Sequence, residues 1–350
     1  MLTEISRDLI NHYLGKSDIN SLLQSQIIKE LYQNLNTEYK NTNVKASHNY
    51  GDFPHSDFIG PSLAKKLSVR NNILTLKWQS QTTGRQSQTT GKNKVQNTLH
   101  IYGKDENYPN TELLVRAISY ITSFSDRNRK ITIHLCLLSD KKTIRKNQKK
   151  LNNLNVNSGM NRFSSTESEI CIFRQEECLK VIFHEVLHGL RCSELGSNEV
   201  ITEKLCVKYK LKSKDILIDE SYTEIWAKLM NCAFISSLSD KDNFQHFCTL
   251  VALEREFSIY QGNKIKQFVK KSSDKNLDKD TNVTAYYLVV GEIFSKFPEF
   301  LMTCDTNVYL RDNQKCLNYL YHLKHIDKRR VKTDDKYYST MRMSIAELEV

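Results

Sequence analysis

The stretch that decides the fold of this 350-residue chain reads Val181-Ile182-Phe183-His184-Glu185-Val186-Leu187-His188-Gly189. Apolar residues surround two histidines in a pattern typical of a buried helix, which we predict to run from Gln175 to about Arg191. Side chains four residues apart lie on the same face of a helix. His184 and His188 therefore point to one place, and Glu185 lies next to the first of them.

Two imidazoles at this spacing can bind one metal ion. The pattern His-Glu-x-x-His on a helix is typical of zinc sites in which the glutamate acts as a general base. Catalytic zinc has three protein ligands and one open position, so a third ligand is needed from elsewhere in the chain. We predict one Zn²⁺ ion as the cofactor, with His184 and His188 as two of its ligands.

A second stretch, Asp219-Glu220-Ser221-Tyr222-Thr223-Glu224, supplies acids downstream. Glu220 and Glu224 are four residues apart, so both point to one side of a second helix. We assign Glu220 as the third zinc ligand. Glu224 is assigned as the acid that accepts a hydrogen bond from a ligand imidazole, with His184 as its expected partner. The reverse assignment of the two glutamates is also open.

Each stretch has a simpler explanation when it is considered alone. A His-Glu-x-x-His match arises by chance in a chain of this composition with a probability of roughly two per cent. Two histidines can lie on a helix face without a metal ion, and two glutamates can belong to an exposed amphipathic helix. The presence of both stretches in one chain favours the zinc interpretation.

Together the two stretches resemble the gluzincin metallopeptidases, in which a glutamate on a following helix is the third zinc ligand. A longer block, from Asn157-Ser158-Gly159 through Ile172-Phe173-Arg174 to His184-Glu185, is similar to gluzincin-like proteins encoded by large DNA viruses. The resemblance implies a zinc peptidase fold but no particular substrate. It also implies a viral protein in the cytoplasm of an infected host cell or in the virion.

Three further groups of residues are candidates for contact with a substrate. The resemblance implies an oxyanion-stabilising tyrosine or histidine, for which our candidate is Tyr287, with Tyr286 behind it and a core role as the alternative. Asn157 and Gly159, with the strand-like run that ends at Phe173, can offer an edge to an extended peptide. Arg342, in a weaker echo of the resemblance, could bind a substrate carboxylate or pair with an internal acid.

Composition limits the classes of partner. The net charge of +11 suits nucleic acid in principle, but the basic residues are spread along the chain without a recognised nucleic-acid module, so we do not expect that partner. No apolar run approaches the length of a membrane span, and the N-terminus lacks a secretory pattern. The nine cysteines form no CxxC pair, which fits an intracellular setting. The oligomeric state is left open.

Strand-like runs precede mostly helical periodicity along the chain. We predict an α+β fold, in which a small mixed or antiparallel sheet packs on a mostly helical zincin-type catalytic bundle. Residues 1–95 are predicted to be an N-terminal helical region plus a hairpin that contains the tandem QSQTTG repeat. Residues 96–350 are predicted to be the zincin-like catalytic domain.

The sequence as a whole predicts a zinc-dependent peptidase that hydrolyses peptide bonds with a metal-activated water and Glu185 as general base. A peptide or protein is the expected substrate, and the choice between endopeptidase and exopeptidase is open. The alternatives are a catalytically inactive zincin-like binding or structural protein and a basic nucleic-acid-binding protein. The presence of Glu185 disfavours the inactive protein, because a purely structural site needs no base.

Overall fold

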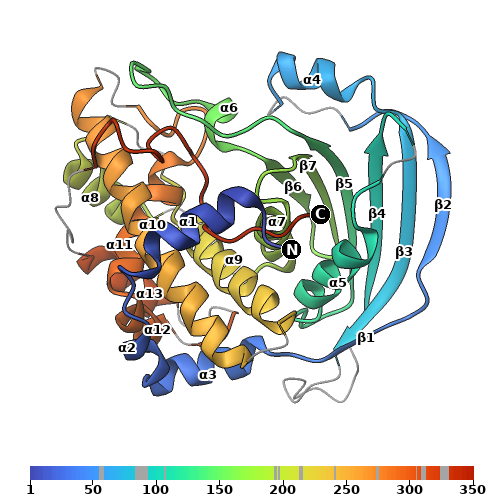
Figure 1. Cartoon of the computed structure of the whole chain (residues 1–350), viewed down its shortest axis with the longest axis horizontal. Coiled ribbons are helices and arrows are strands. Elements are labelled where there is room, and N and C mark those ends of the chain that lie inside the picture. The colour runs from blue at the N-terminus through green and yellow to red at the C-terminus, as the bar shows by residue number, and fades with distance from the viewer. Residues whose placement is uncertain are drawn as a thin grey trace.

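A seven-stranded sheet faces a layer of helices, and helix α7 (Cys178–Leu190) lies between the two (Figure 1). The computed structural model describes the whole chain except residues 55–58, 83–93, 106–107, 193–194, 196–197, 213–215, 240–241, 273–275, 305, 309–312 and 324–330. The α+β class and the mixed sheet are confirmed. The zincin-type character of the helical layer stays a prediction.

The strands follow the order β1-β3-β4-β5-β7-β6 across the sheet, and β2 also pairs with β3. The pairs β4·β5 and β5·β7 are parallel, and the other pairs are antiparallel. Strand β6 is therefore an antiparallel edge strand, and it contacts α7. The strands are β1 (Tyr39–Asn41), β2 (Lys45–Tyr50), β3 (Asn72–Thr82), β4 (Lys94–Gly103), β5 (Arg129–Leu138), β6 (Gly159–Phe163) and β7 (Glu167–Arg174).

The two faces of the sheet bury different sets of side chains, because successive residues of a strand point to opposite faces. One face joins the main core with α5 (Thr111–Thr122) and α7, through residues that include Leu99, Ile133 and Ile170. The other face packs against α4 (Pro61–Leu67) through a smaller cluster that includes Tyr102 and Phe173. The face that joins the main core places the sheet against the helix with the histidine pair.

Helices α9 (Ile218–Ser237) and α10 (Asn243–Lys271) pack on each other in the helical layer, and α9 is buried along nearly its whole length. A π-helical turn, η1 (Thr284–Val289), precedes α11. No helix in the described part of the chain has the length and apolarity of a membrane span. The other helices are α1 (Glu4–Leu14), α2 (Ile19–Leu23), α3 (Gln26–Leu35), α6 (Asn153–Val156), α8 (Glu199–Tyr209), α11 (Val290–Ser295), α12 (Phe297–Cys304) and α13 (Asn313–His322).

The C-terminal segment, which we define as Met341–Leu348, is an extended chain whose eight residues are all buried. It runs between the helical layer and the sheet (Figure 1). Its far end lies beside the start of the chain, where Leu2 forms a β-bridge with Leu348 and the amide of Thr3 donates to the carbonyl oxygen of Glu347 over 2.9 Å. A segment without regular structure thus occupies the interior.

The predicted division at residues 95 and 96 falls inside β4, and residues from both sides of it belong to one core cluster. Of the predicted repeat hairpin, Gln79–Thr82 extend β3, while residues 83–92 lie outside the described residues. The sequence prediction missed β2, whose six residues are all exposed and therefore show no apolar alternation. It also missed the C-terminal segment as a core element.

Two glycines bring α10 into backbone contact with the helical run formed by η1 and α11. A Cβ atom on Gly262 would lie 2.8 Å from the carbonyl oxygen of Tyr287 and 3.4 Å from the Cα atom of Gly291. Backbone atoms cannot turn aside as a flexible side chain can. Glycine at position 262 therefore fixes how closely the tyrosines of η1 approach the rest of the helical layer.

We expect Gly262→Ala to destabilise the protein by about 1–3 kcal/mol, because the added methyl group forces two helices apart. Gly15→Ala is the matched control, since a Cβ atom there meets nothing within 4 Å. Chemical denaturation of both variants measures the free energy of unfolding. Equal losses of stability in the two variants would contradict the close contact at Gly262.

Candidate metal centre

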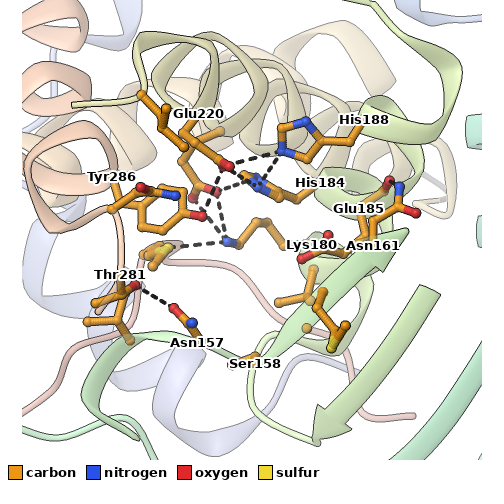
Figure 2. Close-up of a pocket in the computed structure, with 18 of the residues that line it drawn as sticks. Asn157, Ser158, Asn161, Lys180, His184, Glu185, His188, Glu220, Thr281 and Tyr286 are labelled. Carbon is orange, nitrogen blue, oxygen red and sulfur yellow. Dashed lines mark hydrogen bonds and ion pairs between the residues drawn. The ribbon is translucent and has the colours of Figure 1, made fainter. Parts of the chain in front are cut away.

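Helix α7 presents both histidines from a rigid and buried position. Twelve of its residues are buried, and it begins and ends at residues in the left-handed backbone conformation, Glu177 with φ 60° and Arg191 with φ 56°. The predicted helix of residues 175–191 is thus confirmed, with slightly shorter bounds. His184 and His188 project from the same face of α7, as their spacing requires (Figure 2).

The first turn of α9 brings Glu220 to the two histidines. The Oε2 atom of Glu220 lies 3.1 Å from Nε2 of His184 and 3.2 Å from Nε2 of His188. The two Nε2 atoms lie 3.2 Å from each other. Three ligand atoms from two helices therefore form a nearly equilateral triangle, and among the described residues they form the group that could hold a metal ion.

The triangle has the size that zinc requires. Ligand atoms bound to one tetrahedral zinc ion at about 2.0–2.1 Å lie about 3.3–3.4 Å apart. The three separations of 3.1–3.2 Å are within a few tenths of an ångström of that spacing. Two imidazole nitrogens and one carboxylate oxygen are also a donor set found in catalytic zinc sites. The residues present fit the predicted ion.

The charges of the site favour a cation at the same point. Burial opposes the charge of Glu220, but the adjacent His188 and His184 outweigh it and hold the pKa of this carboxyl well below its usual range. Burial alone would lower the pKa of His184, whereas hydrogen bonds with Glu220 and Glu224 raise it to about 10. Either a proton or a metal ion can supply the positive charge that these acids stabilise.

Glu224 lies behind His184, where the sequence placed it. Its Oε2 atom lies 2.9 Å from Nδ1 of His184, the ring nitrogen that faces away from the triangle. Glu224 is fully buried, and both of its oxygens also lie 3.0 Å from Nζ of Lys180. A carboxylate in this position fixes the tautomer and the orientation of a ligand histidine.

Glu185 lines the same pocket as the histidines. Burial raises the pKa of its carboxyl, although the neighbouring His184 and His188 act in the opposite direction. A Cβ atom on Gly159 would lie 3.1 Å from Oε1 of Glu185 and 2.9 Å from Val181, so glycine lets β6 approach the base closely. The amide group of Asn161 adds a 2.7 Å hydrogen bond to the backbone oxygen of Glu185.

The assignment of Tyr287 to the site is corrected by the structure. Tyr287 is buried, and its hydroxyl donates to the carbonyl oxygen of Met341 over 2.6 Å. Its neighbour Tyr286 lines the pocket instead and donates to Oε2 of Glu220 over 2.9 Å (Figure 2). Tyr286 is therefore the tyrosine that faces the metal ligands, and Tyr287 has the core role that was the alternative.

Arg342 does not face the pocket, which corrects its assignment as a substrate-binding residue. Its side chain is fully buried, and Nη1 lies 2.6 Å from Oε2 of Glu347. Arg342 thus pairs with an internal acid, which was the second possibility that the sequence left open. Arg342 stabilises the C-terminal segment rather than a ligand.

The pocket in front of the triangle has a volume of about 420 Å³. Asn157 and Gly159 both line it, and the side-chain oxygen of Asn157 accepts a hydrogen bond from Thr281, which lies beside it (Figure 2). Strand β6 contributes the wall next to Glu185, and its exposed residue Phe163 lies at the rim. The pocket therefore combines the metal ligands, a buried carboxylate and a sheet edge.

Sequence reasoning gave no role to Lys180 or Asn161. Lys180 lies four residues before His184, so the spacing that identified the histidine pair also places this lysine on the same helix face. A lysine inside a helix that is predicted to be buried is the signal that could have revealed a buried partner such as Glu224. Asn161 gave no comparable signal, because it lies on a short strand that the sequence did not predict.

Comparison with known proteins adds nothing to this geometry. No protein-family profile, no curated protein and no solved structure matches the chain.

We expect Glu220→Ala to abolish high-affinity zinc binding, because it removes a ligand atom of the triangle. Glu224→Ala should weaken zinc binding by about 10- to 100-fold, since it removes only the support of a ligand histidine. Competition with a chromophoric zinc chelator measures both affinities. A weaker effect for Glu220→Ala than for Glu224→Ala would reverse the two assignments.

Proposed function

We propose that the protein is a zinc-dependent peptidase of the gluzincin type. The observation that carries this proposal is the triangle of His184, His188 and Glu220 with the buried carboxylate of Glu185 in the same pocket. A structural zinc site is commonly closed by four protein ligands, whereas a catalytic site has three and an open position. Three ligands at the wall of a pocket therefore support a catalytic site.

Zinc in this position would polarise a water molecule and the carbonyl group of a substrate. Glu185 follows a zinc-binding histidine directly in the chain and accepts the proton of the attacking water, then transfers it to the leaving amine. Asn161 holds the backbone of Glu185 by its 2.7 Å hydrogen bond, and Gly159 leaves room for the carboxyl group. These two residues of β6 thus orient the base.

Tyr286 supplies a donor on the other side of the triangle. Its hydroxyl lies 2.9 Å from Oε2 of Glu220 and lines the pocket, so it can turn from this ligand towards a substrate oxygen. A donor at the wall of the pocket can stabilise the negative charge that develops on a carbonyl oxygen during attack. Tyr286 takes the role that the sequence gave to Tyr287.

Strand β6 supports a peptide as the substrate. In the antiparallel pair of β6 and β7, the amide of Phe173 donates to the carbonyl oxygen of Ser158, and the amide of Ser164 donates to that of Glu167. These two bonds show which residues direct their backbone groups towards the partner strand. In such a pair, every second residue directs its backbone groups away from the partner strand. Gly159, Asn161 and Phe163 therefore direct their backbone groups away from β7, where an extended peptide can add a strand.

Glu185→Gln should retain zinc but lower the rate of peptide hydrolysis by about 10²–10⁴-fold, because the amide cannot accept a proton. The test digests a broad peptide library with the zinc-loaded protein and identifies products by mass spectrometry. The variant is the matched control for contaminating peptidases. Wild-type protein that binds zinc but releases no products would support a binding protein on this scaffold instead.

Tyr286→Phe and Tyr287→Phe form a matched pair of adjacent substitutions. We expect Tyr286→Phe to lower kcat by about 10²–10³-fold with little change in KM, as loss of an oxyanion donor does. Tyr287→Phe should leave kcat unchanged and cost about 1 kcal/mol of stability through its lost hydrogen bond. Kinetics on a library-derived peptide, with zinc content measured in parallel, separate the two roles. A loss of kcat in Tyr287→Phe alone would restore the first assignment.

A further inference from the structure

The C-terminal segment passes next to the candidate metal site, where Met343 lines the pocket, and it contacts several buried charged side chains. The amides of Met343 and Ser344 both donate to Oε1 of Glu177, the residue that precedes α7. Lys142 forms an ion pair with the same fully buried glutamate. The segment therefore supplies donors that the carboxylate at the start of the histidine helix requires.

The same segment is held on its other side by a second buried carboxylate. Both the Ser344 hydroxyl, at 2.8 Å, and the Ile345 amide, at 2.9 Å, donate to Oε2 of Glu254 on α10. Lys228 on α9 lies 3.0 Å from Oε1 of Glu254 and also donates to the carbonyl oxygen of Met343. The charges of Glu254 on α10 and Lys228 on α9 are thus partly compensated by polar groups of the segment.

Lys180 joins this network to the metal ligands. Its Nζ atom lies 3.0 Å from both oxygens of Glu224 and 3.5 Å from the sulfur of Met343 (Figure 2). Glu224 in turn lies 2.9 Å from Nδ1 of His184. The side chains of Lys180 and Glu224 have exposed fractions of 3% and 0%, so this ion pair is almost completely removed from bulk water. A continuous chain of contacts runs from the metal ligand to the segment.

We propose that Lys180 is a positioning residue that couples metal binding at His184 to the seating of the C-terminal segment. The inference rests on the metal-binding part of the proposed function, but it does not require catalysis. When the segment is displaced, Glu177 loses its backbone donors and Lys180 loses its contact with Met343. Lys180 then loses one of its fixed partners, so the position in which it holds Glu224 against His184 is less tightly determined.

The physical basis is the cost of an incompletely satisfied buried network. A buried carboxylate without its partners is strongly unfavourable, so the members of the network are either all in place or rearranged together. Coupling between two sites is reciprocal: if the seated segment favours metal binding, the bound metal favours the seated segment by the same factor. Typical couplings of this kind amount to roughly 5- to 150-fold.

Amide hydrogen exchange of the full chain, with and without zinc, tests the coupling directly. Zinc binding slows exchange throughout a protein when exchange requires global unfolding. Leu99 and Ile101 in the central strand β4 therefore serve as internal references. We expect zinc to slow exchange of the Met343, Ser344 and Ile345 amides by about 5-fold or more beyond any change at the references. An equal change at both sets of amides overturns the proposal.

Lys180→Met and Lys208→Met separate coupling from the general loss of a buried ion pair. Lys208 pairs with Glu292 between α8 and α11, away from the segment. We expect Lys180→Met to remove the additional zinc-dependent protection of the segment, while Lys208→Met retains it. If zinc still protects the segment in Lys180→Met, another residue carries the coupling and the role of Lys180 is wrong.

The outcomes distinguish this inference from the function on which it rests. Wild-type protein that binds no zinc contradicts the metal site itself, and with it both proposals. Zinc binding and peptide hydrolysis without additional protection of the segment contradict only the coupling. Because the wild-type comparison needs no substitution, the inference stays testable even if Lys180→Met does not fold.

Discussion

The contact between the buried carboxylate of Glu224 and the ammonium group of Lys180 is the interaction on which the site depends. A carboxylate that is removed from water needs a positive partner, and Glu224 has one on each side, His184 and Lys180. The pair fixes α7 against α9, because one partner lies on each helix. This fixed packing brings Glu220, one turn earlier on α9, to the two histidines.

The sequence could predict the candidate metal ligands because the members of each pair lie on one helix. Spacing of four residues places His184 with His188 and Glu220 with Glu224, whatever the rest of the chain does. The choice between Tyr286 and Tyr287 could not be made in this way. These residues lie in the π-helical turn η1, where the wider turn changes which side chain faces the pocket. Neither tyrosine has a partner of the site at a fixed spacing in its own helix, so no local rule selects Tyr286 over Tyr287.

Two other features had no clear signal in the local sequence. Arg342 finds Glu347 and Glu176 in the interior, and nothing in its local sequence distinguishes this arrangement from a ligand contact. Strand β6 is short and lies at an edge, so it has neither the length nor the apolar alternation that identifies a strand. Both outcomes depend on how the surrounding elements pack around these residues, which the local sequence does not show.

The buried C-terminal segment has a consequence for the order in which the protein assembles. Met343 lies 163 residues beyond Lys180 in the chain, so the ribosome completes α7 and α9 long before it adds Met343, the residue of the C-terminal segment that Lys180 contacts. A nascent chain that already carries both histidines and Glu220 still lacks the backbone donors for Glu177. If the proposed coupling holds, the candidate metal site would be completed only after synthesis of a C-terminal stretch that contributes no ligand to it.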